Sequence, residues 1–405
     1  MNNPFLSLKH TNYRYYIIGM FISNIGTWMQ NIAQPWLAYQ ITDNAFQISL
    51  VSAMQFLPTL LISAFAGAII ENQDKRKMLF YTQSVLLITT LSMAILVFFG
   101  LIRYWHILVL ATFMGIATSF DMPIRQSFVI QLVPKNNLMN AIALNSTVFN
   151  LARILGPAVA GMILAYYGTG VCFLINSVSF LAVILSLFFI HPLEPPIPVT
   201  NERIHLKSVL KNVLEGFSYI ARRPEISIIL LSSFVVSCFG MNNSVLLPVF
   251  VTKVLHMQET SYGFITTCMG IGSFAGALIL ASKSTKGPSR FFLTIGPLLL
   301  GLSLTAVGIL NEYLTTLILF SSIGYFFVSY AATANTSIQL LVHDEYRSRV
   351  MSIYTLVNAG TVPIGNLFTG IIVTSFGASI GFLVNGAVII VLMALFCLKI
   401  FFGKS

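Results

Sequence analysis

Apolar runs recur along this chain from about residue 14 to about residue 400, and many are longer than 18 residues. Runs of that length match the hydrocarbon core of a bilayer and predict membrane-spanning helices. Only 8% of the residues are charged, whereas an ordinary soluble domain has about 25%. The chain also lacks the alternating segments of roughly ten residues that are typical of a membrane β-barrel. We therefore predict an all-α membrane protein.

Twelve transmembrane helices are predicted, in two groups of six. The only long polar segment, residues 192–226, separates an N-terminal half, residues 1–191, from a C-terminal half, residues 227–405. The predicted spans are 14–40, 46–70, 78–102, 105–131, 138–166, 170–191, 227–252, 260–282, 290–311, 314–340, 348–375 and 378–400.

Lysine and arginine are distributed unequally between the two sides of the predicted membrane. The tails and the even-numbered loops carry 18 of the 22 residues, whereas the odd-numbered loops carry only Arg103 and Lys253. Because cytoplasmic loops carry such an excess, we expect both termini and the 192–226 segment to be cytoplasmic. The net charge of +10 is spread over many short loops rather than gathered in one patch. It therefore does not predict nucleic-acid binding.

The central segment contains two different patterns. PLEPPIPVTNE is proline-rich and predicts an extended linker. The following LKSVLKNVLEGFSYIARR places its apolar residues on one helical face, with Lys207 and Lys211 off that face. This predicts an amphipathic helix at the cytoplasmic membrane surface. A helix with this pattern can also bind a protein partner, and the sequence leaves both alternatives open.

The two halves are related by an internal repeat with a shift of 209 residues. The shift aligns AFAGAII at 64–70 with SFAGALI at 273–279, and FLIN at 173–176 with FLVN at 382–385. It also aligns three pairs of glycines, namely Gly156 with Gly365, Gly161 with Gly370 and Gly168 with Gly377. Parallel six-span repeats are a known plan of secondary transporters, which handle substrate between the halves. We therefore predict two pseudo-symmetric halves and a transport function.

A membrane enzyme would need ionisable side chains gathered around a reaction centre. The six histidines are instead scattered, and the chain has no metal-ligand spacing, nucleophile arrangement or phosphate-binding loop. We expect no enzymatic activity, no metal and no cofactor. A channel would also use many spans, but the repeat and the central linker favour a carrier.

Polar residues form a stripe along the first predicted span, at spacings of three and four residues that place them on one helical face. Lipid cannot satisfy such groups, so the stripe faces other helices or a cavity. Together with the seventh span, it predicts a cavity for a neutral or amphipathic substrate. The predicted lining residues are Asn24, Thr27, Trp28, Asn31, Gln34, Met241, Asn242 and Asn243. Hydrogen bonding between helices alone would also explain these polar residues.

Three ionisable residues lie deep within predicted spans, Asp121 and Arg125 in the fourth and Arg153 in the fifth. Asp121 and Arg125 share a helical face because they are four residues apart. Charges at such depth are costly unless paired or hydrated, so they should face the protein interior. One interpretation is a structural ion-pair cluster. The other is that Asp121 exchanges its arginine partner, or a proton, during transport.

The loop after the second span, GAIIENQDKRKML, has a glycine, an acid four residues later and then a basic cluster. It resembles the signature loop of the major facilitator superfamily, with Gly67, Glu71, Lys75 and Arg76 at the matching positions. Glu71 stands where Asp is usual, and Asn72 where a basic residue is usual. The resemblance implies a cytoplasmic gate, which would be weaker or differently built here. The basic residues alone could instead serve only to set the orientation.

The fifth span carries ARILGPAVAG, which is similar to the Gly-Pro motif of exporter branches of that superfamily. Gly156, Pro157 and Gly161 match the motif, and Ala152 replaces its first glycine. Pro157 removes a backbone donor and bends the helix, while the glycines permit close packing. The bend could serve a gate or be merely structural.

Two longer stretches, NIGTWMQNIAQPWLAYQIT and DMPIRQSFVIQLVP, resemble the branch that includes the enterobactin exporter and macrolide-efflux proteins. The resemblance covers essentially the whole chain. It implies a secondary active transporter in the bacterial cytoplasmic (inner) membrane that exports a small organic molecule by alternating access, driven by proton antiport. We expect a monomer whose other partners are protons and membrane lipid. A siderophore or lipid-like metabolite carrier of the same fold, and a non-transporting scaffold or sensor, are the alternatives.

Overall fold

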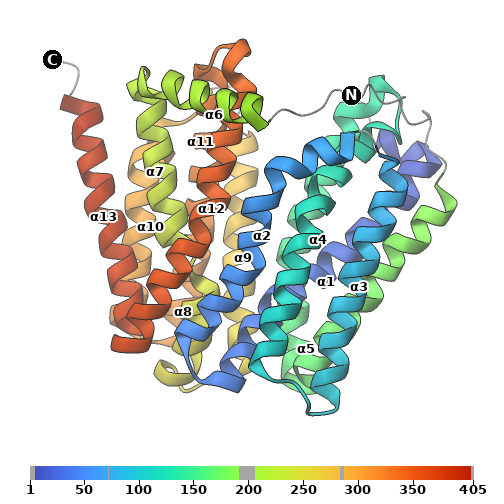
Figure 1. Ribbon diagram of the computed structural model, residues 1–405. Coiled ribbons are helices and arrows are strands. Elements are labelled where there is room, and N and C mark those ends of the chain that lie inside the picture. Colours follow the sequence, from blue (N-terminus) through green and yellow to red (C-terminus); the bar gives the residue numbers. More distant parts are fainter. Residues whose placement is uncertain (1–4, 72, 191–205, 283–286, 403–405) are drawn as a thin grey trace. The chain divides into compact units, whose positions relative to one another are not determined.

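The computed structural model describes residues 5–71, 73–190, 206–282 and 287–402, and every regular element in these ranges is helical (Figure 1). The N-terminal half contains α1 (Thr11–Thr42), α2 (Ala45–Glu71), α3 (Lys75–Phe98), α4 (Tyr104–Ile130) and α5 (Leu138–Phe189). The linker forms α6 (Leu206–Ala221). The C-terminal half contains α7 (Pro224–Gly240), α8 (Asn243–Val249), a π-helical turn η3 (Phe250–Val254), α9 (Glu259–Ser282), α10 (Arg290–Leu310), α11 (Tyr313–Leu341), α12 (Asp344–Phe376) and α13 (Ala378–Phe402). Two short 3-10 turns are η1 (Leu6–Lys9) and η2 (Lys135–Asn137).

Nine helical segments in the described residues are long and apolar enough to cross a membrane. One of them, α5, has 52 residues and breaks at Gly168. It supplies two spans, because about 20 residues suffice to cross a bilayer. Helices α1 and α2, with 32 and 27 residues, have the length to add two more. The architecture therefore agrees with the twelve predicted spans.

The break in α5 has a counterpart in the second half. Gly168 has φ 76° and ψ −178°, and Gly377, between α12 and α13, has φ 86° and ψ 167°. Only glycine adopts this conformation readily. The two glycines are 209 residues apart, so the repeat is present as the same backbone conformation at equivalent places.

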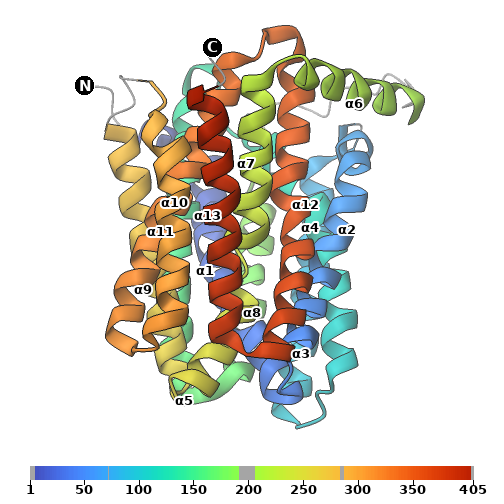
Figure 2. The same ribbon diagram turned by 90° about the vertical axis from the view of Figure 1, so that its left-hand side faces the viewer.

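Contacts divide the chain into two compact units. Unit 1 comprises Met1–Thr42 and Met54–Glu202, and unit 2 comprises Asp43–Ala53 and Arg203–Ser405. Within unit 1, α5 packs along α1 and α3, and α4 packs against α3. Within unit 2, α11 packs along α9 and α10, and α13 packs along α10 (Figure 2).

Residues 43–53 pack with unit 2, although the residues on both sides of them in the chain belong to unit 1. An ion pair joins Asp43 Oδ2 to Lys253 Nζ at 2.7 Å. The backbone N–H of Phe46 donates to Thr374 Oγ1 at 3.0 Å. The loop after α1 and the start of α2 are therefore held by side chains of the C-terminal half.

The linker helix α6 packs across the start of α12 in unit 2 (Figures 1 and 2). Glu215 forms an ion pair of 2.8 Å with Arg349, and the ring of Tyr219 stacks on that of Tyr346 with 4.5 Å between centroids. The apolar side chains of Leu214 and Phe217 remain 66% and 48% exposed. This end of the linker is thus attached to unit 2 while part of its apolar surface stays uncovered.

The seventh span, which we predicted as continuous, is interrupted between α7 and α8. Asn242 lies at the interruption, and its Nδ2 donates to the carbonyl oxygen of Cys238 at 2.8 Å. Helix ends leave carbonyls without helical partners, and this side chain satisfies one of them. The same Nδ2 donates to Thr369 Oγ1 of α12 at 2.8 Å. Asn242 therefore ties the interruption to a neighbouring helix.

Candidate functional site

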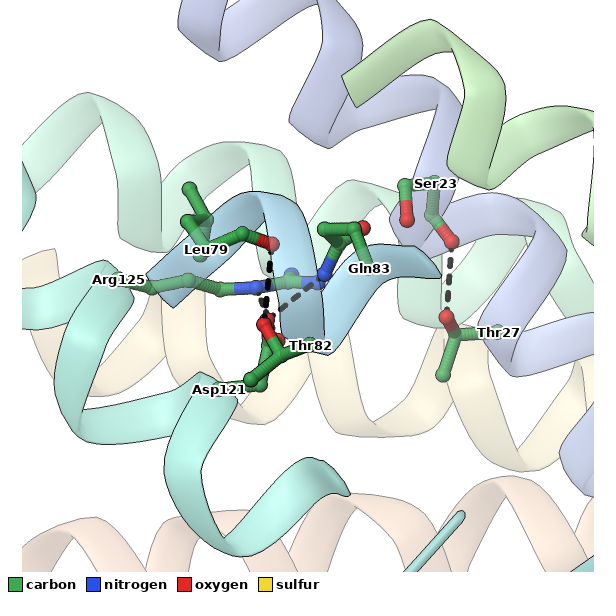
Figure 3. A network of polar contacts seen from close by, with 7 residues as sticks. All are labelled: Ser23, Thr27, Leu79, Thr82, Gln83, Asp121 and Arg125. Atoms are coloured by element: carbon green, nitrogen blue, oxygen red, sulfur yellow. Dashed lines mark hydrogen bonds and ion pairs between the residues drawn. The ribbon is translucent and has the colours of Figure 1, made fainter. Parts of the chain in front are cut away.

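A buried carboxylate lies in α4 of unit 1. Asp121 is 3% exposed and forms an ion pair with Arg125, one turn further along the same helix. Its Oδ1 also accepts hydrogen bonds from Thr82 Oγ1 at 2.8 Å and from Gln83 Nε2 at 2.7 Å, both on α3 (Figure 3). Charge-assisted hydrogen bonds of this kind are stronger than neutral ones, and together they stabilise the ionised carboxylate.

Beyond these polar partners, the neighbouring side chains on α3 and α4 are apolar and buried. Leu79, Ile124 and Phe128 are fully buried members of the same hydrophobic cluster. Tyr16 of α1 is also buried there and lies within electrostatic reach of both Asp121 and Arg125. Because the local dielectric is low, a change in the charge of Asp121 has large energetic consequences.

The third predicted ionisable residue, Arg153 of α5, lies against an aromatic side chain. Its guanidinium carbon is 5.9 Å from the centroid of the Trp28 ring of α1. The Trp28 ring also meets Phe149 edge-on, with 5.9 Å between centroids. The structure thus brings Asp121 to Arg125 and brings Arg153 to Trp28, which the sequence analysis placed in the cavity lining.

The Gly-Pro motif lies where α5 crosses α1. A Cβ atom added at Gly156 would be only 2.4 Å from Trp28 Cβ, so this approach requires glycine. Pro157 and Gly161 are buried within α5. The helical path continues through Pro157, and the non-helical residue of α5 is Gly168.

The polar stripe of α1 leads into a buried amide network. Gln30 Nε2 donates to Gln34 Oε1 at 3.1 Å, and Gln34 Nε2 donates to Gln55 Oε1 of α2 at 3.2 Å. Gln30 Oε1 accepts from Thr90 Oγ1 of α3 at 3.2 Å and from Asn176 Nδ2 of α5. The network joins four helices of unit 1 and gives Gln34 a structural role besides its predicted place in a cavity.

The other predicted members of the stripe have different environments. Asn24 is buried, Thr27 is half-buried and Asn31 is exposed. The hydroxyl of Thr27 donates to the carbonyl oxygen of Ser23 on its own helix at 2.9 Å.

In unit 2 the predicted lining residues lie at the interruption of the seventh span. Met241 is half-buried, whereas Asn242 and Asn243 are buried. Thr369 and Asn385 hydrogen-bond to each other, at 3.0 Å from Asn385 Nδ2 to Thr369 Oγ1, and so extend the contact made by Asn242.

Part of the predicted cytoplasmic gate falls outside the described residues. Gly67 and Glu71 lie near the end of α2, but the surroundings of Gly67 and the side chain of Glu71 are not among the described features. Lys75 begins α3 and is half-buried. Arg76 Nε donates to the carbonyl oxygen of Leu187 at 2.7 Å, at the C-terminal end of α5. Arg76 therefore caps a helix end, where cations are favourable.

Two functional candidates, Gln30 and Gln83, were missed by the sequence analysis. Gln30 could have been found, because it is three residues after Thr27 and four before Gln34 and so belongs to the same stripe. Gln83 lies between Thr82 and Ser84 in an otherwise apolar stretch, and nothing in the sequence indicates that it would meet Asp121.

The helical halves, the repeat and the buried polar groups together define a multi-pass membrane transporter, and comparisons with known proteins agree. Residues 2–402 match the family described as "Transmembrane secretion effector", and the chain belongs to this family of major facilitator transporters. The prediction of a transporter rather than an enzyme is thereby confirmed.

Individual relatives carry names from the same class. The chain is 28% identical over 368 residues to the staphyloferrin A transporter of Staphylococcus aureus, covering 90% of each chain. It is 20% identical to macrolide efflux protein A of Streptococcus pyogenes, covering 94% of this chain and 95% of the relative. Among solved structures, the nucleoside transporter NupG superimposes with a TM-score of 0.75 at 11% identity, covering 95% of this chain and 98% of that one. This last likeness concerns the fold alone.

Proposed function

We propose that this protein exports a small organic molecule across the bacterial cytoplasmic membrane by alternating access, in exchange for protons. The observation that carries the proposal is the buried Asp121, which is paired with Arg125 and accepts hydrogen bonds from Thr82 and Gln83. A carboxylate in such a place can take up a proton only when its surroundings reorganise. A group that couples proton uptake to a conformational change needs this property. A structural ion pair would show the same contacts, so the experiment has to separate the two roles.

The test uses inside-out vesicles with an imposed proton gradient and a panel of candidate substrates. Asp121→Asn cannot bind or release a proton at this position. The variant should therefore lose uphill, gradient-driven transport while retaining downhill exchange of labelled substrate, which needs no net proton movement. Proton-driven transport at the wild-type rate by Asp121→Asn would refute the coupling role.

A siderophore is the second candidate substrate. The observation that favours it is the 28% identity with the staphyloferrin A transporter over 90% of each chain. Macrolide efflux protein A, at 20% identity, favours a drug-like substrate instead. The substrate panel should therefore include a metal-free siderophore and a macrolide. A lipid-like metabolite remains a further candidate, and a scaffold or sensor would transport none of them.

We assign the remaining predicted residues to supporting roles in the same proposal. Gly67, Glu71, Lys75 and Arg76 form a cytoplasmic gate, and Gly156, Pro157 and Gly161 allow the helix packing on which it depends. The amides of α1 and of the α7–α8 interruption, with Trp28 and Met241, contact substrate. Replacing Glu71 with Gln should weaken cytoplasmic closure, which spin labels on the cytoplasmic helix ends would record as longer distances.

The proposed orientation places both termini and the linker in the cytoplasm, since the linker side carries most of the Lys and Arg residues. Ala221, at the end of α6, and Leu101, in the loop between α3 and α4, are both exposed. In a background without native cysteines, Leu101→Cys should react with an impermeant thiol reagent added to intact cells. Ala221→Cys should react only after the cytoplasmic side is opened. The reverse pattern would invert the topology and the proposed direction of transport.

A further inference from the structure

Unit 2 contains a layer of uncharged polar side chains at one depth of its spans. Ser233 of α7, Tyr330 of α11 and Tyr354 of α12 are each about ten residues from the helix end that lies on the α6 side of the unit. At a rise of about 1.5 Å per residue, that depth is about 15 Å, or half of the roughly 30 Å hydrocarbon core of a bilayer. The hydroxyls of Ser233 and Tyr330 lie 3.1 Å apart. The layer is therefore near the membrane midplane, where secondary transporters bind their substrates.

Helices α7, α11 and α12 meet around this layer, and α7 lies beside α12 (Figures 1 and 2). The hydroxyl of Tyr354 donates to the carbonyl oxygen of Ala331 on α11 at 3.1 Å. Ser237 Oγ of α7 donates to Asn358 Oδ1 of α12 at 2.8 Å. The amides of Asn335 and Asn358 lie within hydrogen-bonding reach of the Tyr354 hydroxyl. Three helices thus bring hydroxyl and amide groups to one place.

One face of α11 connects this place to the end of the helix. Ala331, Asn335 and Gln339 share the face because they are four residues apart. Tyr354 is only 6% exposed, Asn335 is half-buried, and Gln339, two residues from the end of α11, is exposed. The Nε2 of Gln339 donates to Asn335 Oδ1. Since lipid cannot pair with amides, this rising exposure indicates a route to water on the α6 side of the unit.

The groups that meet here carry no charge. Helix α11 contains no charged residue, and α7 contains none after Glu225. On α12 the nearest charged residue toward the α6 side, Arg349, is paired with Glu215 of α6. An amide nitrogen has two N–H groups and a phenol oxygen has lone pairs, so these side chains can both donate and accept. They therefore complement a hydroxyl or an amide better than a carboxylate or an ammonium group.

We propose that Tyr354, Asn335 and Asn358 form a substrate subsite that hydrogen-bonds an uncharged hydroxyl or amide group of the transported molecule; this rests on the proposed export function. The substrate enters from the α6 side of the unit, past Gln339. Its polar group then lies between the Tyr354 hydroxyl and the two amides. Ser237 is a positioning residue, because its hydroxyl holds the amide of Asn358 in orientation.

The test measures the binding of labelled probes to purified protein in detergent, without a proton gradient. The probes are a metal-free siderophore and a macrolide. Tyr354→Phe removes only the hydroxyl, and Asn335→Leu keeps the size of the side chain without its amide. For a probe that binds the wild type, each variant should raise the Kd about fivefold, the equivalent of one hydrogen bond. Because the lost contact involves no charge, this ratio should be the same at low and high salt.

The control is Tyr325→Phe, which removes a phenol hydroxyl of α11 outside the layer and keeps the ring that meets Phe292. Its Kd should equal that of the wild type, and size-exclusion chromatography checks that every variant is folded. Wild-type Kd values in both Tyr354→Phe and Asn335→Leu would overturn the subsite and leave the export function intact. An effect that disappears at high salt would overturn the uncharged ligand group. If the wild type binds neither probe and transports no member of the substrate panel, the export function and the subsite are both wrong.

Discussion

Positions related by the internal repeat carry different chemistry in the two halves. Asp121 of unit 1 corresponds to Tyr330 of unit 2, and Arg125 corresponds to Ala334. Asp121 is an ion-paired carboxylate, whereas Tyr330 is a buried phenol whose hydroxyl lies 2.6 Å from Ser232 Oγ and 3.1 Å from Ser233 Oγ. Both are buried polar groups held by a neighbouring helix, but only the first belongs to an ion pair.

The comparison shows that a duplicated fold can keep the same backbone conformation in both halves while the buried side chains differ. The glycines that shape the backbone, Gly168 and Gly377, are equivalent and have the same conformation. The ionisable groups deep in the spans, Asp121, Arg125 and Arg153, all belong to unit 1. The backbone conformation at these glycines is therefore retained in both halves, while these three ionisable residues lie in one.

The largest expected difference between the halves concerns Asp121. Replacing it with Asn leaves the half-buried Arg125 without its carboxylate, and the cost should approach the roughly 3–5 kcal/mol of fully buried pairs. The measurement is the unfolding free energy in detergent. The double variant Asp121→Asn/Arg125→Gln should recover most of the loss. A double variant no more stable than the single one would show that the ion pair is not the source of the cost.

The backbone comparison predicts a smaller and equal effect in the two halves. Gly168→Ala and Gly377→Ala each force a side chain into a conformation that suits only glycine, although nothing lies within 4 Å of either added Cβ. Each should lower the unfolding free energy by about 1–3 kcal/mol. Gly296→Ala, inside α10 with its nearest atom at an ordinary 3.6 Å, serves as the control and should be neutral or slightly stabilising. Clearly unequal losses at the two positive-φ glycines would argue against structural equivalence of the breaks.

The phenol of unit 2 should matter less than the carboxylate of unit 1. Tyr330→Phe removes the hydroxyl that contacts Ser232 and Ser233 but leaves no unpaired charge. We expect a loss of about 1 kcal/mol in unfolding free energy. The pH dependence of proton-driven transport should stay the same. A changed pH profile in this variant would mean that unit 2 also takes part in proton handling.

The smallest effect is expected for an exposed charge. Asp43 and Lys253 form an ion pair at 2.7 Å, but their side chains are 63% and 57% exposed. Asp43→Asn should change the unfolding free energy by less than about 1 kcal/mol, and added salt should remove even that difference. An effect as large as that of Asp121→Asn would contradict the view that burial makes the unit 1 charges important.

Much of the fold could be predicted from the sequence because its signals are local. Apolar runs identify the spans, and glycines recurring at one offset identify the repeat. The interruption between α7 and α8 was missed, since the run from Ile226 to Val251 is uniformly apolar apart from small polar residues. At the break, Asn242 donates to Cys238 and to Thr369, and Thr369 is 127 residues away in the chain.

The candidate site was predictable only in part, for a related reason. The spacing of Asp121 and Arg125 indicated a shared helical face, and the structure pairs them. The α3 partners of Asp121, Thr82 and Gln83, come from a different helix, 39 and 38 residues away. Sequence spacing says which residues share a face, but not which neighbouring helix that face meets.

The sequence by itself determined that this chain is a twice-repeated helical membrane protein, because hydropathy and glycine conformation act over a few residues at a time. It also showed that three charges lie inside spans. Only the tertiary structure decided that Asp121 meets Gln83 and that Arg153 lies over Trp28. These contacts depend on the packing of helices distant in the chain. The energies involved are large because burial removes the water that would otherwise pair with each group.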